Sequence, residues 1–67
     1  MKQIEELTNG QATSCQIVKF VELADRYDIP ISEAIQKNAK WDPLLGVLFF
    51  VVKSLWIGIE KDGYAHS

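Results

Sequence analysis

Cysteine and histidine are the residue types here that most readily act as nucleophile, base or metal ligand, and each occurs once, as Cys15 and His66. Cys15 falls in the first turn of a predicted helix, where the helix dipole favours the reactive thiolate. Catalysis by a thiolate needs a base held beside it, and His66 falls in residues 64–67, which we expect to form a tail. One cysteine and one histidine also fall short of the usual ligand set of a zinc site. We therefore expect neither a catalytic residue nor a bound metal.

The charged residues are dispersed rather than clustered. Seven basic and nine acidic side chains give a net charge of −2. The carboxylates fall at predicted helix ends or on solvated faces, so none is distinguished as a general acid or base. Lys53 is the one charge embedded in apolar sequence, and we expect its ammonium group to be ion-paired or to reach water. Because no phosphate-binding glycine loop occurs, the sequence predicts a protein that is not an enzyme and holds no cofactor.

Length and composition predict a single domain over residues 1–67. The apolar fraction of 48% is too high for a disordered chain. A domain of this size buries only about 60% of the surface that its unfolded chain exposes. A single cysteine cannot form an internal disulfide, so we expect self-association or assembly with another protein to supplement the core. The lone cysteine, and an N-terminal segment without the apolar core of a signal peptide, predict a cytoplasmic location.

The clearest predicted element is an amphipathic helix that begins after Thr13. Thr13 and Gln16 have the spacing of a capping box, in which each side chain bonds the backbone N–H of the other residue. Apolar side chains then recur at helical spacing, and Pro30 ends the helix near residues 28–29. The apolar stripe consists of Ile17, Phe20, Val21, Ala24 and Tyr27. Residues 1–12 precede this helix as one helical turn or a flexible arm.

A second, short helix is predicted after Pro30. Ser32 provides an N-cap with Glu33 in the first turn, and the helix continues to about Lys40. Its apolar edge is thin, and two helical turns do not persist alone in water. The helix must therefore dock against neighbouring elements.

The stretch from Val21 to Ile35 resembles a helix-turn-helix, with Asp28 standing where the turn glycine of that motif is usual. The resemblance implies a DNA-binding alternative. In that alternative the residues facing the major groove are Ser32, Gln36, Lys37 and Lys40. The even spread of positive charge weighs against it, because binding to phosphates needs clustered lysines and arginines.

Residues 43–59 carry the densest apolar surface in the chain. Asp42 as N-cap and Pro43 at the first helical position predict a helix here, which a stop at Gly63 would end. The β-branched and aromatic residues of the same stretch favour strands, with a hairpin turning at Lys53–Ser54 as the competing prediction. The length of the run and the Asp-Pro cap favour the helix. The predicted fold is therefore an all-α, three-helix bundle with a long apolar C-terminal helix. An α+β fold with a C-terminal β-hairpin is the alternative.

The way residues 43–59 are buried decides the predicted function. The two preceding helices are too short to cover a helix that is apolar nearly all round, and a large exposed apolar patch usually marks an interaction site. We therefore predict a small accessory, adaptor or inhibitor subunit that docks a protein partner or forms a homo-oligomer. Large aromatic residues dominate interface energetics. The residues predicted to bind the partner are Trp41, Leu48, Phe49, Val52, Trp56 and Ile59.

Two other ways of burying residues 43–59 remain open. In the first, a compact monomer closes around the segment. In the second, the segment inserts into a bilayer and anchors the protein to a membrane. The charge-free run from Leu44 to Val52 is nine residues long, whereas a helical span needs about 20. Lys53, near the middle of the segment, would cost about 2.5–3.5 kcal/mol on insertion.

Overall fold

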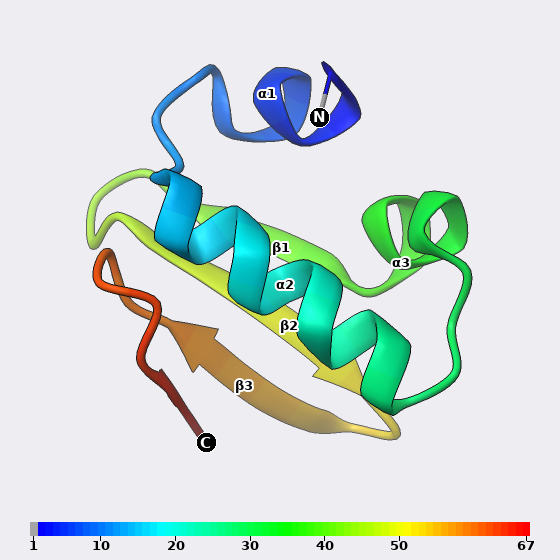
Figure 1. The fold of residues 1–67 in the computed structure, drawn as a ribbon. Coiled ribbons are helices and arrows are strands. Elements are labelled where there is room, and N and C mark those ends of the chain that lie inside the picture. The colour runs from blue at the N-terminus through cyan, green and yellow to red at the C-terminus, as the bar shows by residue number, and fades with distance from the viewer. Residues whose placement is uncertain (1) are drawn as a thin grey trace.

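The protein is built as a layer of helices on an antiparallel sheet. Within residues 2–67, which the computed structural model describes, three helices precede a four-stranded sheet with the strand order β1-β2-β3-β4 (Figure 1). The elements are α1 (Lys2–Thr8), α2 (Ser14–Arg26), α3 (Ile31–Lys37), β1 (Ala39–Asp42), β2 (Val47–Val52), β3 (Leu55–Ile59) and β4 (Ala65–His66). The helices lie on one side of the sheet, and α2 packs on β2 and β3 (Figure 1). The predicted all-α, three-helix bundle is therefore wrong, and the α+β alternative describes the fold.

The long helix expected over residues 43–59 is replaced by a single turn followed by two strands. Asp42 does cap that turn, because its Oδ1 accepts hydrogen bonds from the Leu44 and Leu45 amides at 3.0 and 3.1 Å. The Gly46 amide donates to the Asp42 carbonyl at 2.8 Å, and Gly46 has a φ of +67°, a left-handed conformation that stops a helix. The Asp-Pro signal thus starts the β1–β2 turn, and the β-branched and aromatic residues beyond it form strands.

The competing hairpin prediction is confirmed, including the position of its turn. Val52 pairs with Leu55, and the two residues between them, Lys53 and Ser54, have φ values of +50° and +67°. Two successive positive φ values are typical of the type I′ turn that joins antiparallel strands through two residues. Lys53 is exposed at this turn, so the charge embedded in apolar sequence lies between two strands rather than inside one.

The start of α2 forms as predicted. Thr13 Oγ1 accepts a hydrogen bond from the Gln16 amide at 3.1 Å, and Gln16 Oε1 accepts one from the Thr13 amide at 2.9 Å. At its other end the helix stops at Arg26, close to the predicted boundary. Asp28 then has a φ of +59°, in the position that a glycine usually fills after a helix.

The short helix differs from its prediction at both ends. α3 begins at Ile31 with Pro30 as its N-cap residue, so Ser32 is not the cap. The helix ends at Lys37, and Lys40, expected to be helical, belongs to β1.

Asn38 explains why α3 stops early. Its Nδ2 donates to the Val51 carbonyl at 2.7 Å, and its own carbonyl accepts from the Val51 amide at 2.7 Å. These two bonds attach the chain to β2 directly after the helix, and the pairing continues into β1.

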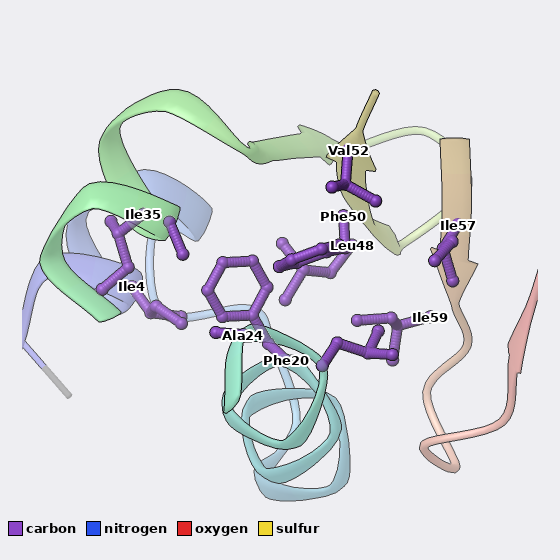
Figure 2. Close-up of a cluster of buried hydrophobic side chains, with 11 residues drawn as sticks. Ile4, Phe20, Ala24, Ile35, Leu48, Phe50, Val52, Ile57 and Ile59 are labelled. Carbon is purple, nitrogen blue, oxygen red and sulfur yellow. The ribbon is translucent and has the colours of Figure 1, made fainter. Parts of the chain in front are cut away.

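The core lies between α2 and one face of the sheet, with α1 and α3 closing one side (Figure 2). The buried cluster consists of Ile4, Phe20, Leu23, Ala24, Ala34, Ile35, Leu48, Phe50, Val52, Ile57 and Ile59. The rings of Phe20 and Phe50 meet edge to face, with their centroids 5.4 Å apart. Within residues 1–12, Ile4 of α1 is fully buried in this cluster. Within residues 64–67, Ala65 of β4 packs against it.

Gln16 is a polar side chain that is fully buried in this interior. Besides its bond in the capping box, its Nε2 donates to the carbonyls of Gly46 and Ile59 at 2.9 and 3.0 Å. Thr13 adds a bond from its Oγ1 to the Lys61 carbonyl at 2.6 Å. The start of α2 is thereby fixed both to the β1–β2 turn and to the end of β3.

We expect Gln16→Met to lower the free energy of unfolding by about 3 kcal/mol, because each buried polar group left without a partner costs about 1–3 kcal/mol. Methionine keeps the side-chain length and removes the bonds to Thr13, Gly46 and Ile59. Gln11→Met, at an exposed position, is the control and should change this free energy by less than about 0.5 kcal/mol. Urea denaturation measures both variants. If Gln16→Met were as stable as Gln11→Met, Gln16 would not be what holds α2 to the sheet.

The turn between β2 and β3 gives a second stability test. We expect Ser54→Gly to raise the free energy of unfolding by about 0.5–1 kcal/mol, because a left-handed conformation costs a non-glycine residue about 1–2 kcal/mol. Glycine loses part of that gain in backbone entropy. Ser32→Gly, within α3, should instead lower the free energy by about 0.5–1 kcal/mol. A loss of stability in Ser54→Gly would contradict the positive φ at this residue.

Candidate functional site

The sheet has a second face, which points away from the helices. Alternate residues of a strand point to opposite faces, so the residues between the core positions lie on this second face, which we call the outer face. Its central residues are Val47, Phe49 and Val51 of β2 with Trp56 and Gly58 of β3, and its borders are Lys40 of β1 and His66 of β4. None of them belongs to the core cluster beneath the helices, but Val47 and Gly58 are buried, Phe49 and Val51 are half-buried, and Trp56 is exposed. Within residues 2–67, no helix covers the outer face (Figure 1).

The strand register arranges the outer face in rows. The central row crosses the whole sheet and consists of Lys40, Phe49, Gly58 and His66. The neighbouring row pairs Val51 with Trp56. Side chains of one row lie at the same height along the strands, so the order of residue types across the sheet is fixed by the backbone.

Phe49 and Trp56 form the apolar centre of the outer face. Their ring centroids are 5.6 Å apart, and the rings meet edge to face at 73°. Trp56 is 51% exposed. Gly58 lies beside Phe49 without a side chain, and a Cβ atom added there would lie 3.4 Å from both the Phe49 ring and the Val47 side chain. Gly58 is itself buried beside these neighbours, so the accessible part of the centre consists of the exposed Trp56 ring and the partly buried Phe49 ring.

Opposite charges lie at the two ends of the central row. His66 Nε2 lies 2.6 Å from Glu60 Oε2, and the His66 ring stacks on Tyr64 with the centroids 5.7 Å apart. At the other end, no carboxylate within residues 2–67 lies in ion-pairing distance of the Lys40 ammonium group. One border of the outer face thus carries Lys40 together with Asp42, and the opposite border carries the Glu60 carboxylate bound to the His66 imidazole.

The six residues predicted to bind a partner are divided between the two faces of the sheet. Those on the core side are Trp41, Leu48, Val52 and Ile59. Phe49 and Trp56 are the two that lie together on the outer face. Sequence reasoning missed the neighbours that complete this surface, namely Val47, Val51 and Gly58. No periodic signal in residues 47–59 marks them, because both faces of β2 carry apolar residues, so their place on one face follows only from the strand register.

The residues of the DNA-binding alternative do not share one surface. Ser32, Gln36 and Lys37 are exposed on α3, whereas Lys40 lies on β1 with its side chain on the outer face. Glu33 lies in the first turn of α3, where its charge would repel a phosphate.

The remaining residues with reactive side chains do not assemble into a chemical centre. Cys15 is exposed and lines an open hollow with Lys19 and Tyr64, but the Lys19 ammonium group is paired with Glu22 at 3.1 Å. Within residues 2–67, no three side chains of the cysteine, histidine, aspartate and glutamate types are placed to hold a metal ion. None of the helices in that range has the length and apolar content required for crossing a membrane.

No protein-family model, curated protein or solved structure matches this chain. Its function must therefore be inferred from its own residues and geometry.

Phe49 and Phe50 are consecutive residues on opposite faces of the sheet. Substituting each of them therefore tests which face is the core side and which is the outer face. We expect Phe50→Ala to lower the free energy of unfolding by about 3–5 kcal/mol, because its ring is fully buried among core side chains. Phe49→Ala should cost about 1 kcal/mol, since its ring is only partly buried on the outer face. Urea denaturation of the two variants measures the difference. A larger loss of unfolding free energy for Phe49→Ala than for Phe50→Ala would show that Phe49, rather than Phe50, lies on the buried face.

Proposed function

We propose that this protein acts without catalysis, by binding protein through the outer face of its sheet, as an accessory, adaptor or inhibitor subunit. The observation that carries the proposal is the Phe49–Trp56 pair. These two rings are in contact on a face that the helices do not cover, and Trp56 is half exposed.

The outer face is more apolar than the open face of such a sheet usually is, although its Val47 is buried. An antiparallel sheet with helices on one face normally alternates apolar residues inside with polar residues outside. Here β2 carries Val47, Phe49 and Val51 at the outward positions, while the core cluster is built from the inward ones. Aromatic residues on an open surface are the usual anchors of protein interfaces. The outer face is therefore best explained as a surface that another protein covers.

The charges of the outer face favour protein over nucleic acid as the ligand. Binding to phosphates needs several lysines or arginines on one surface. The outer face carries Lys40 at one border, and at the other border His66 is already bound to the Glu60 carboxylate. An aromatic centre with Lys40 and the carboxylates of Asp42 and Glu60 at its rim instead matches the usual anatomy of a protein interface.

The proposed setting is the cytoplasm. Cys15 is exposed and has no second cysteine in the chain, and such a thiol persists in a reducing compartment.

Site-directed photo-crosslinking in the source cell tests the proposal. With a benzophenone amino acid at position 56, on the outer face, we expect protein adducts, whether with another protein or with a second copy. With the same group in place of Glu22, exposed on α2, adducts should be lacking. Phe49→Ser should reduce the adducts from position 56. Equal adducts from positions 22 and 56, or none from position 56, would refute the outer face as the binding surface.

A further inference from the structure

We infer that two copies of this chain form a dimer through the end of the molecule that carries the β1–β2 turn. A pair of leucines that projects from this turn packs into an apolar hollow of the other copy, and a two-fold axis makes the contact occur twice. The outer face takes no part in this contact, so the inference goes beyond the proposed function and does not depend on it.

The most exposed large apolar side chains gather at this end. Within residues 2–67, Leu44 is 95% exposed, and Leu45, Val18 and Tyr64 are 64–66% exposed, more than any other large apolar side chain. The leucines lie on the β1–β2 turn, Val18 lies in the first half of α2, and Tyr64 lies in the β3–β4 connection. Figure 1 shows these three segments at the same end of the molecule. Apolar surface that the core does not use is thus concentrated here, as at an interaction site.

Leu44 and Leu45 form a knob on a turn whose backbone is fixed by hydrogen bonds. Their amides donate to Asp42 Oδ1 at 3.0 and 3.1 Å, and the Gly46 amide donates to the Asp42 carbonyl at 2.8 Å. The Gly46 carbonyl in turn accepts a bond from the buried Gln16 side chain at 2.9 Å. A backbone that is already ordered loses little entropy on binding, so the turn presents the knob in a preorganised form.

The hollow lies beside the knob, across residues 60–62. Its walls come from the start of α2 and from the β3–β4 connection, and Cys15, Val18 and Tyr64 are among its lining residues. Its volume of about 510 Å³ is large enough to take two leucine side chains. Asp62 borders both features, because it lines the hollow and also adjoins Leu45 on the knob side. An apolar projection and an apolar recess are therefore neighbours on one surface.

A half-turn about an axis between the knob and the hollow brings both contacts together. The knob of each copy then faces the hollow of the other, so the interface is isologous and closes after two copies. Leu44 and Leu45 of one copy pack against Val18 and Tyr64 of the other. A knob and a hollow on opposite sides of the molecule would instead produce an open chain of copies. Their adjacency is what favours a closed dimer.

The charges beside the axis agree with this arrangement. Lys61 and Asp62 are consecutive, exposed residues between the knob and the hollow. Within residues 2–67, no carboxylate lies in ion-pairing distance of the Lys61 ammonium group. Because the two residues lie next to the axis, each Lys61 can pair with the Asp62 carboxylate of the other copy. The rim of the interface thus gains two ion pairs that one copy alone does not form.

The interface is small, and the dimer is therefore weak. Each copy contributes four exposed apolar side chains to it, whereas a typical stable complex uses roughly 20–30 residues a side. We expect a dissociation constant of about 0.1–1 mM, in the range of weak and concentration-dependent association.

Sedimentation equilibrium of the purified chain, from about 10 µM to about 2 mM, tests the inference. The wild type should pass from monomer towards dimer over this range. Leu44→Ser should weaken the dimer at least about tenfold, because an apolar side chain is lost from both symmetric contacts. Leu55→Ser, at an exposed leucine beside the β2–β3 turn, is the matched control and should leave the dimer unchanged. Circular dichroism verifies that each variant is folded.

The thiol of Cys15 reports on the hollow itself. Cys15 is the only cysteine of the chain, and its side chain is exposed in the hollow of the monomer. The rate constant of its alkylation by iodoacetamide should fall at least about twofold between about 10 µM and about 2 mM protein, because the knob of the other copy covers it. Leu44→Ser should remove this dependence on concentration.

A mixing experiment tests the two-fold arrangement. Val18→Asp places a carboxylate in the hollow and should weaken the dimer, as Leu44→Ser does by removing part of the knob. In a mixed dimer of these two variants, one of the two contacts combines an intact knob with an intact hollow. The mixture should therefore associate several-fold more strongly than either variant alone.

Four results would each overturn the inference: a monomer throughout the concentration range, a dimer that Leu44→Ser leaves unchanged, alkylation of Cys15 that does not slow as the dimer forms, or a mixture no stronger than its components. Trp56 belongs neither to the knob nor to the hollow, so protein adducts from position 56 are measured independently. Those adducts would leave the proposed function standing even if the dimer were disproved.

Discussion

The buried side chain of Gln16 holds α2 against the sheet, and the arrangement of both sheet faces depends on that attachment. Its amide bonds the cap of α2, the β1–β2 turn at Gly46 and the end of β3 at Ile59. Buried polar groups must be paired, so these bonds allow α2 only one placement along the strands. The apolar stripe of α2 then covers the face that carries Phe50 and Ile57, and the opposite face is left open.

The core and the proposed binding surface occupy opposite faces of the same sheet. The core is completed by inward-pointing strand residues together with side chains from α1, α2 and α3. The outward residues Phe49 and Trp56 are in contact with each other and are not part of that core. Stability and the proposed binding therefore depend on alternate residues of the same strands, and we expect a substitution on one face to change one property with little effect on the other.

Local hydrogen-bonded caps could be predicted from the sequence, but the secondary structure of residues 43–59 could not. The capping box at Thr13 and Gln16 forms as predicted, and the turn at Lys53–Ser54 occurs where the alternative hairpin prediction placed it. Asp42 also caps a helical turn as predicted, but Gly46, in a left-handed conformation, ends it after one turn. A strand with one solvated face shows alternation, and β2 does not, because its outward residues are apolar too. The apolar outward residues of β2 therefore prevented its prediction as a strand, and the same residues distinguish the outer face in the structure.

The candidate site could be predicted only in part for the same reason. Phe49 and Trp56 were recognisable as interface aromatics, but the choice between them and Leu48, Val52 or Ile59 needs the strand register. The position of Gly58 beside the Phe49 ring follows from its cross-strand pairing and has no signature of its own in the sequence.

The two tryptophans give the most direct test of the central claim, that the outer face is the surface the protein buries on binding. Trp41 packs against the core and Trp56 lies on the outer face, so their indole N–H signals report on the two faces separately. In nitrogen-15 NMR spectra of the labelled chain recorded before and after addition of a source-cell extract, the Trp56 signal should shift or broaden while the Trp41 signal stays fixed. A shift confined to Trp41, or equal shifts of both signals, would contradict the account.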